Sequence, residues 1–367
     1  MLSSNYELTM KIAVFSPYLD TKGGGERYIL TVASIFSEKH KVDLLLPTHL
    51  HNLNPDEYKA DVSKRLDIDL SKVTFVHAPI GQGSKTIDRY FFLKRYDLLF
   101  AVTDGSIFLA SSKRNILHIQ TPLDVHPSSS NWGRIKLKSW HEVVYNSEFT
   151  KKYSQKNWPL PSRVIYPPVE IGHQNKVPKK NIILSVGRFF GYLKEKKHQM
   201  MIEAFAKLVE TGQIKGWDLY LAGSMGEGDQ TYVDQLKSLA AGLPIMILPN
   251  IAHEDLKHLY AMSKIYWHAM GFEETDPTKM EHFGITTVEA MAAGVVPVVI
   301  KKGGQIEIVE ENKSGLFWQT EAELIEETKK LVADSKKLDQ LSSGAVERAQ
   351  MFSQERFKKE ILELIND

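Results

Sequence analysis

The stretch EHFGITTVE, residues 281–289, carries two carboxylates, Glu281 and Glu289, with a glycine and two threonines between them. A solvated helix face has no need of a glycine there, and a buried strand would not carry an acid at both ends. Gly284 instead permits a sharp turn into a helix that starts with ITTVE. The spacing places one acid before the turn and the other more than one turn into the helix.

The start of this helix is suited to binding an anion. The first backbone N–H groups of a helix have no intrahelical acceptor, and together with the helix dipole they stabilise phosphate oxygens. Carboxylates on either side can accept hydrogen bonds from sugar hydroxyls. The segment therefore predicts a ligand with a sugar at Glu281, a diphosphate in the middle and a ribose at Glu289. The amides expected to be free belong to Ile285, Thr286 and Thr287.

Two basic residues are candidates for the same diphosphate. In SVGRFFGYLKEKKHQ, Arg188 follows an apolar run, and Lys196 comes shortly before a helical pattern. Arginine offers a forked donor to phosphate oxygens, and lysine offers a point charge. The alternative is a solvated basic loop, because Lys194 and Lys197 stand beside Lys196.

A glycine turn near the N-terminus is a second candidate for binding a ligand. Gly23, Gly24 and Gly25, in KGGGER, follow the first apolar run and precede a helical pattern. Glycines let the backbone approach a ligand and present amides to an anion, although such a turn is also common without one. A dinucleotide fold would need G-x-G-x-x-G and an acid after the second strand, where this chain has LLLPTH. A nicotinamide dehydrogenase is therefore not expected.

Elements of a parallel α/β fold must position these residues. Short apolar runs alternate with amphipathic segments along the whole chain, which is typical of βαβ units. The pattern restarts after the proline-rich stretch 162–181, which we interpret as a linker. We expect an N-terminal Rossmann-like domain over 1–165 that binds the acceptor, and a donor-binding one over 166–353. The expected strands span 11–17, 41–47, 72–78, 96–103, 115–120 and 142–147 in the first half, and 181–188, 217–224, 245–250, 264–269, 295–300 and 314–318 in the second.

Composition limits the classes of protein. The 46 basic and 45 acidic side chains nearly cancel, and no recognition motif supports nucleic acid as a partner. The absence of cysteine excludes disulfides and thiolate chemistry, and it fits a reducing compartment. The first ten residues lack the pattern of a signal peptide, and no apolar run is long enough to span a bilayer. We expect a cytoplasmic protein.

Four separated motifs resemble those of one enzyme family. GGGER, SVGR with KEKKHQMMIEAF, EHFGITTVEAMAAGVVPVV and GGQIEIV are similar to the retaining glycosyltransferases of family 4, which have the GT-B fold. EHFGITTVE fits the E-x7-E motif of that family, and its wording is similar to α-mannosyltransferases that use GDP-mannose. The resemblance implies two Rossmann-like domains around a sugar-nucleotide cleft, with the C-terminal helix 354–367 packing back on the first domain and the domains closing by pivots near 163–171 and 350–354.

The resemblance also implies roles for individual residues. The glycine turn would lie against the donor phosphates or the acceptor. Arg188 and Lys196 would bind the diphosphate, Glu281 the sugar hydroxyls, and Glu289 the ribose. The rest of the expected donor pocket consists of Phe283, Gly284, Ile285 and Thr286, with Asn250 and Ile251 framing the base.

The chain departs from the family at one position. The family has a histidine beside the donor sugar after an N-domain strand, where this chain reads ILHIQTP. Gln120 occupies the expected place, and His118 lies two positions earlier. Residues two apart on a strand share a face, so either could reach the cleft. His118 could equally be a core residue.

The family reaction needs neither a metal nor a carboxylate nucleophile. The departing phosphate can take the acceptor proton on the same face while the protein positions the substrates and stabilises charge. Asp67 and Asp69 resemble a metal-binding Asp-x-Asp motif, but their polar connection favours a surface pair. A glycosidase with Glu281 and Glu289 as acid and nucleophile, a sugar-nucleotide epimerase and a non-catalytic sugar-binding module are the alternatives.

The donor and the acceptor both remain open. The sequence does not choose between GDP-mannose and a UDP-sugar, and the acceptor is expected to be a glycan, a glycolipid or a lipid-linked glycan. Residues 131–163 hold seven basic side chains among Trp132, Trp140 and Trp158. This stretch could contact anionic lipid peripherally at the inner membrane face, or it could be an ordinary basic flank. The basic residues are Arg134, Lys136, Lys138, Lys151, Lys152, Lys156 and Arg163.

Overall fold

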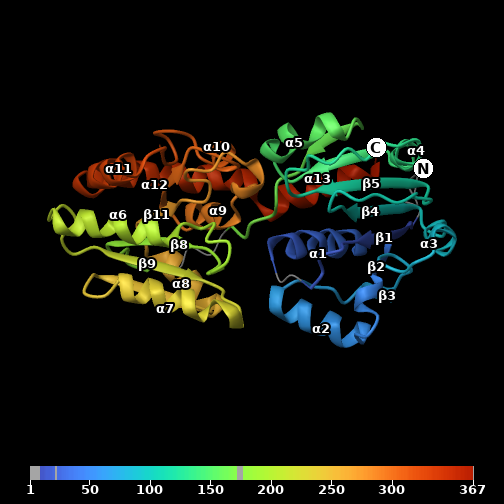
Figure 1. The fold of residues 1–367 in the computed structure, drawn as a ribbon, viewed down its shortest axis with the longest axis horizontal. Coiled ribbons are helices and arrows are strands. Elements are labelled where there is room, and N and C mark those ends of the chain that lie inside the picture. The colour runs from blue at the N-terminus through green and yellow to red at the C-terminus, as the bar shows by residue number, and fades with distance from the viewer. Residues whose placement is uncertain (1–8, 21–22, 172–176, 367) are drawn as a thin grey trace, which may run out of the picture. The chain divides into compact units, whose positions relative to one another are not determined.

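The computed structural model describes residues 9–20, 23–171 and 177–366. The chain forms two compact units, of which unit 1 comprises Met1–Pro167 with Phe357–Asp367 and unit 2 comprises Pro168–Arg356. Each unit has a parallel sheet with helices on both faces (Figure 1). This architecture confirms the predicted α/β class.

Unit 1 contains a seven-stranded sheet in the order β3-β2-β1-β4-β5-β6-β7, in which every neighbouring pair is parallel. The order reverses between β1 and β4, and ligands of such sheets bind at the carboxyl ends of the strands beside this switch point. The strands are β1 (Lys11–Phe15), β2 (Lys41–Leu46), β3 (Val73–His77), β4 (Leu98–Val102), β5 (Arg114–Ile119), β6 (Glu142–Tyr145) and β7 (Ser162–Val164). The helices are α1 (Gly24–Ser37), α2 (Pro55–Leu66), α3 (Thr86–Leu93), α4 (Asn131–Lys138), α5 (Glu148–Ser154) and α13 (Gln354–Asn366).

Unit 2 repeats this topology with six parallel strands in the order β10-β9-β8-β11-β12-β13, so its switch point lies between β8 and β11. The strands are β8 (Ile182–Val186), β9 (Asp218–Gly223), β10 (Ile245–Pro249), β11 (Ile265–His268), β12 (Val296–Ile300) and β13 (Leu316–Trp318). The helices are α6 (His198–Glu210), α7 (Gln230–Leu239), α8 (His253–Met262), α9 (Ile285–Ala292), α10 (Gln305–Ile308), α11 (Glu321–Ala333) and α12 (Ser335–Ala349).

The strands are apolar on both faces because helices cover both sides of each sheet. In β1, Ile12 and Val14 enter one buried cluster of unit 1, while Ala13 and Phe15 enter the other. Helix α13 packs its fully buried Phe357 into the first of these clusters, and Figure 1 draws this red helix beside the earlier elements of unit 1.

The predicted linker over 162–181 is wrong at its start. Residues Ser162–Val164 form β7, which pairs in parallel with β6 at the edge of the sheet. The segment is three residues long and is followed closely by two prolines, which cannot donate to a strand ladder. The linker prediction also covers 172–176, and the glycine turn begins at Lys22; both lie outside the described residues.

Candidate active site

Glu281 is the centre of a polar cluster in unit 2. Its Oε2 atom accepts hydrogen bonds from Lys196 Nζ at 2.6 Å and from His268 Nε2 at 3.0 Å. His268 is the last residue of β11, and Lys196 lies in the connection between β8 and α6. The cluster therefore stands at the carboxyl ends of the two strands that flank the switch point, where parallel sheets bind ligands.

The neighbours of Glu281 fix its charge. Burial by itself would raise the pKa of this carboxyl, but Lys196 and His268 outweigh burial and hold the pKa well below its usual range. Burial also lowers the pKa of His268, so a neutral ring donates its Nε2 proton to the carboxylate. The His268 Nδ1 atom is buried and has no hydrogen-bond partner in the described structure. Glu281 is thus an ionised acceptor at neutral pH.

The path of the Lys196 side chain explains why residue 187, in the motif SVGR, is a glycine. A Cβ atom at Gly187 would come within 2.8 Å of Lys196 Cγ, so the lysine stem crosses the glycine on its way to Glu281. Two of the three ammonium protons of Lys196 remain for other acceptors. The structure thus brings Lys196 and Glu281 together, as one pre-formed pair.

Arg188 follows β8 and is exposed. Its guanidinium carbon lies 5.1 Å from the centre of the Phe190 ring, and no carboxylate in the described ranges forms an ion pair with it. The side chain is therefore a cation that can pair with a ligand anion.

Helix α9 begins where the sequence predicted. Its N-cap, Gly284, has φ +118°, and a Cβ there would lie 2.3 Å from Nε2 of Gln305. The prediction of three free amides is wrong for Thr287, because its N–H donates to the Gly284 carbonyl at 3.0 Å. The helix geometry leaves the amides of Ile285 and Thr286 for an external anion.

The side chain of Phe283 packs in the interior of unit 2. The ring is buried and meets the Phe352 ring edge-on at 5.4 Å. The predicted contact between Phe283 and a ligand is therefore corrected to a packing role that fixes the entry into α9.

Glu289 is half-buried, and its Oε2 atom accepts a hydrogen bond from the Tyr260 hydroxyl at 3.0 Å. The hydroxyl of Tyr266 donates to Thr286 Oγ1 at 2.8 Å on the preceding turn. Two tyrosines from α8 and β11 thus hold the side chains of α9. Glu289 is therefore a half-buried, hydrogen-bonded carboxylate and not a solvated surface acid.

Asn250 and Ile251 form the turn after β10. Asn250 adopts φ +54°, donates its N–H to the Gly223 carbonyl at 2.7 Å, and accepts the Met225 N–H on Oδ1 at 2.9 Å. Ile251 is half-buried. These bonds fasten the β10 turn to the loop after β9, so the backbone of this turn is positioned independently of any ligand.

In unit 1 the structure brings Gln120 and the glycine turn together. Gly23 caps α1, and Gly24 and Gly25 are its first residues. A Cβ at Gly25 would lie 2.2 Å from Gln120 Oε1, and Gln120 Nε2 donates to the Gly25 carbonyl at 3.4 Å. The glycine at this position leaves room for the Gln120 amide.

His118 is corrected from a candidate ligand contact to a core residue. Its ring is fully buried and stacks on Tyr28 at 4.1 Å, while Nδ1 bonds to the Val144 carbonyl at 2.9 Å. Burial lowers the pKa of His118 to about 3. A ring enclosed in this way cannot contact a solvent-borne sugar.

The side chains of residues 131–163 are not all on the surface. Trp140 and Trp158 are buried, and only Trp132 among its three tryptophans is exposed, at 50%. Arg163 pairs with Glu142 rather than with a ligand or lipid. This stretch is therefore not a continuous aromatic and basic surface.

Two polar residues of unit 2 were missed. His268 lies at the carboxyl end of the strand expected over 264–269. Parallel sheets bind ligands at such ends, so His268 could have been predicted as a site residue. Gln305 lies within GGQIEIV; it is fully buried against Gly284, and neither atom of its amide has a hydrogen-bond partner in the described part of the chain. The spacing of residues in the sequence does not tell how deeply Gln305 is buried.

Among the described residues, no three His, Asp or Glu side chains form a group that could hold a metal ion. Asp67 ends α2 with φ +53°, and Asp69 accepts the Ser71 N–H at 2.9 Å. None of the described helices has the length and apolar character needed to cross a bilayer.

Comparison with known sequences connects unit 2 to one family. Residues 169–348 match the family described as Glycosyl transferases group 1. The mouse GDP-Man:Man(3)GlcNAc(2)-PP-Dol alpha-1,2-mannosyltransferase is 31% identical over 179 residues, which cover 44% of this chain and 34% of that protein. A protein of the same name from Candida glabrata is 27% identical over 361 residues, which cover 80% of this chain and 69% of that protein. The match to the mouse protein thus spans about a third of that relative.

Solved structures share the whole fold. Anabaena HepE in complex with UDP has a TM-score of 0.73 at 19% identity, with 97% of this chain and 100% of that chain covered. Sucrose-phosphate synthase from Thermosynechococcus elongatus has a TM-score of 0.65 at 15% identity, with 97% of this chain and 98% of that chain covered. The predicted GT-B fold class is confirmed, and so is the resemblance to glycosyltransferases. The match to glycosyl transferases group 1 lies in residues 169–348, which is just under half of the chain.

Proposed function

We propose that the chain is a glycosyltransferase that moves a hexose from a nucleotide-diphosphate sugar to a glycan or lipid-linked acceptor. The observation that carries this proposal is the ionised Glu281, held by Lys196 and His268 four residues before the first turn of α9, whose first amides have no acceptor within the helix. A carboxylate for sugar hydroxyls and amides for phosphate then follow one another along the chain.

In this proposal the diphosphate lies at the amides of Ile285 and Thr286 and is neutralised by Arg188 and Lys196. These donors would stabilise the charge that develops when the sugar–phosphate bond breaks. The departing phosphate takes the proton of the acceptor hydroxyl, so transfer proceeds with retention and without a metal or a carboxylate nucleophile. Glu289 binds the ribose, and the β10 turn at Asn250 frames the base.

GDP-mannose is the donor that we propose first. The mouse and Candida relatives are named as mannosyltransferases that use GDP-Man, whereas the HepE structure contains UDP. The names of these relatives include a dolichol-linked glycan, so a lipid-linked acceptor and peripheral membrane contact belong to the same proposal.

The charge of Glu281 argues against a glycosidase. A glycosidase general acid needs a raised pKa so that it carries a proton at working pH. Lys196 and His268 instead lower the pKa of Glu281, which suits an acceptor of hydroxyl hydrogen bonds.

Nucleotide binding and sugar transfer test the proposal separately. GDP, UDP and their sugars are screened for an increase in Tm, because a ligand that binds only the folded state stabilises it. Transfer of labelled sugar is then measured for the wild type, Glu289→Ala and Arg188→Ala. We expect Glu289→Ala to weaken donor binding and Arg188→Ala mainly to lower turnover.

Unchanged kinetics in both variants, with folding intact, would contradict the site. The products decide between the alternatives. Interconversion of the free donor identifies an epimerase, and release of sugar from a glycoside without a nucleotide identifies a glycosidase. Donor binding without turnover over a range of acceptors identifies a sugar-binding module.

A further inference from the structure

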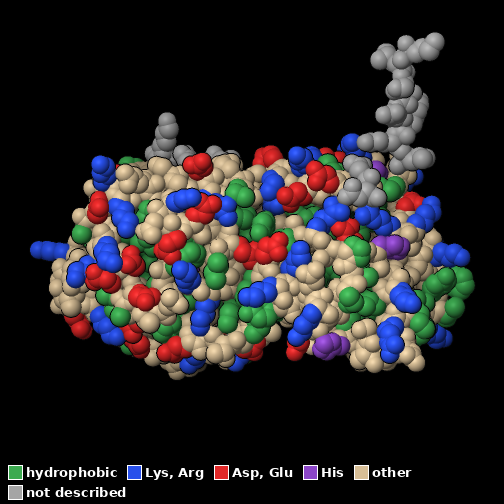
Figure 2. Space-filling view, turned by 90° about the horizontal axis from the view of Figure 1, so that it is seen from above, with side chains coloured by type: hydrophobic (Ala, Val, Ile, Leu, Met, Phe, Trp, Pro, Cys, Tyr) green, Lys and Arg blue, Asp and Glu red, His purple; other side chains and the backbone are tan. Residues whose placement is uncertain are grey.

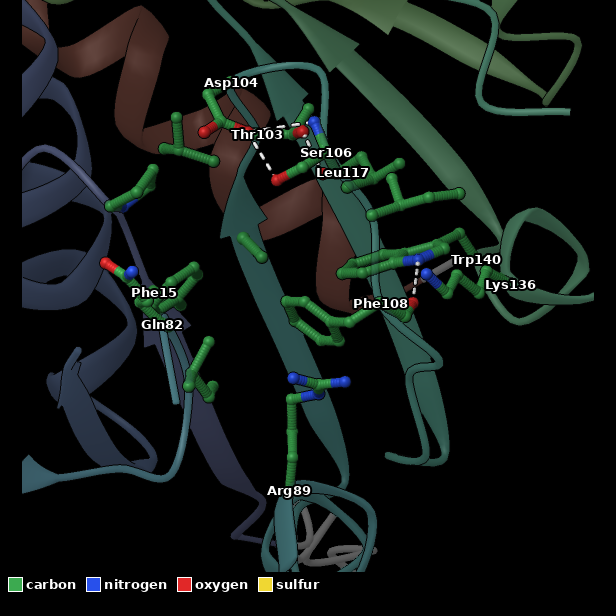
Figure 3. A pocket seen from close by; sticks show the side chains of 16 residues that line it. Phe15, Gln82, Arg89, Thr103, Asp104, Ser106, Phe108, Leu117, Lys136 and Trp140 are labelled. Atoms are coloured by element: carbon green, nitrogen blue, oxygen red, sulfur yellow. Dashed lines mark hydrogen bonds between the residues drawn. The ribbon is translucent and has the colours of Figure 1, made fainter. Parts of the chain in front are cut away.

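Unit 1 contains a cavity of about 380 Å³ at the carboxyl ends of β1, β4 and β5 (Figure 3). Strands β1 and β4 flank the switch point of this sheet, which is the position where parallel sheets bind ligands. The cavity lies outside the residues 169–348 that match the family. It therefore occupies a position at which parallel sheets bind ligands, in the part of the chain before the family match.

Two cations line this cavity from different helices. Arg89 comes from α3 and Lys136 from α4, and neither forms an ion pair with any carboxylate of the described ranges. Arg89 is half-buried, with its guanidinium carbon 5.0 Å from the centre of the Phe108 ring, and its Nε atom is buried without a partner. Figure 3 shows the side chains of Arg89 and Lys136 extending toward Phe108.

Asp104, the acidic residue in the lining of the cavity, already accepts hydrogen bonds within the chain. Asp104 Oδ1 accepts hydrogen bonds from the Ser106 N–H at 2.9 Å and from the Ser106 hydroxyl at 2.6 Å. These bonds hold it in a turn at the end of β4. Arg89 and Lys136 thus bring two positive charges to the cavity against the one negative charge of Asp104, and an anion with several oxygens, such as a phosphate, can pair with both cations.

The same two helices also carry exposed apolar side chains. Ile87 and Phe91 on α3 are 56% and 60% exposed, and Trp132 and Ile135 on α4 are both 50% exposed. Figure 2 shows hydrophobic side chains beside Lys and Arg at the end of unit 1 where Figure 1 draws α3. Exposed apolar and basic side chains on one helix face are typical of contact with an anionic lipid surface.

We infer that the cavity of Arg89 and Lys136 binds the phosphate of an acceptor that is carried on a lipid surface. The inference rests on the proposed function and gives its acceptor a chemical class and a position. Helices α3 and α4 lie on the anionic bilayer, and the phosphate enters between them. Phe15, Phe108 and Trp140 are among the walls, and their apolar surfaces reduce the screening of the two cations.

Inorganic pyrophosphate is the probe for the cavity, and its binding to the full chain is measured by calorimetry. Arg89→Gln and Lys136→Gln should each weaken the binding about tenfold. Arg95→Gln and Lys138→Gln are the matched controls, because they remove exposed charges next to the same helices but outside the cavity. Arg188→Ala identifies any part of the signal that comes from unit 2.

Vesicles distinguish a lipid-borne phosphate from a soluble one. Trp132 is the exposed tryptophan, since the other five are buried, so a blue shift of tryptophan emission reports its entry into lipid. We expect the shift with vesicles of phosphatidylglycerol and phosphatidylcholine, and a much smaller one with phosphatidylcholine alone. Phe91→Ser should reduce vesicle sedimentation several-fold and leave pyrophosphate affinity unchanged.

If Arg89→Gln and Lys136→Gln leave the affinity for pyrophosphate unchanged, the inference is wrong. Binding that needs both residues, without any vesicle contact, overturns the lipid source and identifies a soluble phosphorylated ligand. The proposed function fails in a different way. In that case nucleotide sugars neither bind nor react, while the dependence of pyrophosphate binding on Arg89 remains.

Discussion

At the scale of residues, the site of unit 2 depends on one fixed charge. Glu281 is ionised because Lys196 and His268 both donate to the same oxygen. The carboxylate is only 19% exposed, so water does little to screen these contacts. The cluster therefore contributes to stability as well as to ligand binding.

Replacing Glu281 by Gln should lower the free energy of unfolding by about 1–3 kcal/mol at neutral pH. The folded-state pKa of Glu281 is depressed, so this stabilisation is complete above the unfolded pKa of about 4.3 and is lost as the pH falls through the folded value. Urea unfolding of both proteins from about pH 7 to about pH 3 measures the difference. A difference that stays constant on acidification contradicts the assignment.

Gly25→Ala should separate stability from activity in unit 1. The new Cβ would meet Gln120 Oε1 at 2.2 Å, and this flexible amide can move away. The free energy of unfolding should change by less than about 1 kcal/mol, while the displaced Gln120 lowers the rate of sugar transfer. Gln120→Ala is the control: if Gly25→Ala acts by displacing Gln120, the two substitutions are not additive in the double variant. Full transfer activity in Gly25→Ala would show that the Gln120 amide has no role.

The sequence could predict the positions of these residues but not their depth. Gln120 and the glycine turn follow strands at the same edge of the sheet, so their proximity follows from topology. His118 shares a strand face with Gln120, yet it lies under Tyr28 in the core. In a parallel sheet covered on both faces, spacing does not distinguish an edge residue from a buried one.

At the scale of elements, the start of α9 is shaped by one glycine. Gly284 has φ +118° and packs against the amide of Gln305. This conformation starts α9 at Ile285, so the amides of Ile285 and Thr286 have no acceptor within the helix. The expected strands were found because each is a short apolar run between polar turns, whereas β7 was missed because it has only three residues near prolines.

Gly284→Ala should be more damaging than the same change at Gly212. Both glycines have positive φ, +118° and +69°, but a Cβ at Gly212 meets nothing within 4 Å. Gly212→Ala should therefore cost about 1 kcal/mol of backbone strain, and Gly284→Ala should add a clash with Gln305 and lose nucleotide-induced stabilisation. Thermal unfolding with and without GDP measures both effects. Equal losses in the two variants would refute a special role for this turn.

At the scale of the whole molecule, the chain completes its first unit last. Helix α13 returns to unit 1 after the whole of unit 2. Its Phe357 is fully buried and meets Tyr28 edge-on at 4.9 Å, and Tyr28 in turn stacks on His118. The family resemblance implied a C-terminal helix over 354–367 that packs on the first domain, and in the structure Ser353 Oγ accepts the Arg356 N–H at 3.3 Å before this helix.

Phe357→Ala should lower the stability of unit 1 by about 3–5 kcal/mol, because it leaves a cavity beside Tyr28. Lys359→Ala on the exposed side of α13 is the control, and we expect little change from it. Hydrogen exchange should accelerate in β1–β7 and remain unchanged in β8–β13. Uniform acceleration across both sheets would mean that the two units unfold together.

This return of α13 has a consequence for biosynthesis. A ribosome releases the strands of unit 1 long before it reaches Phe357, so the newly made sheet waits with part of its core uncovered. Unit 2 has all of its own elements by Arg356 and can fold while the nascent chain is still attached. During translation, the half that begins first is therefore the half that a chaperone has to protect longest.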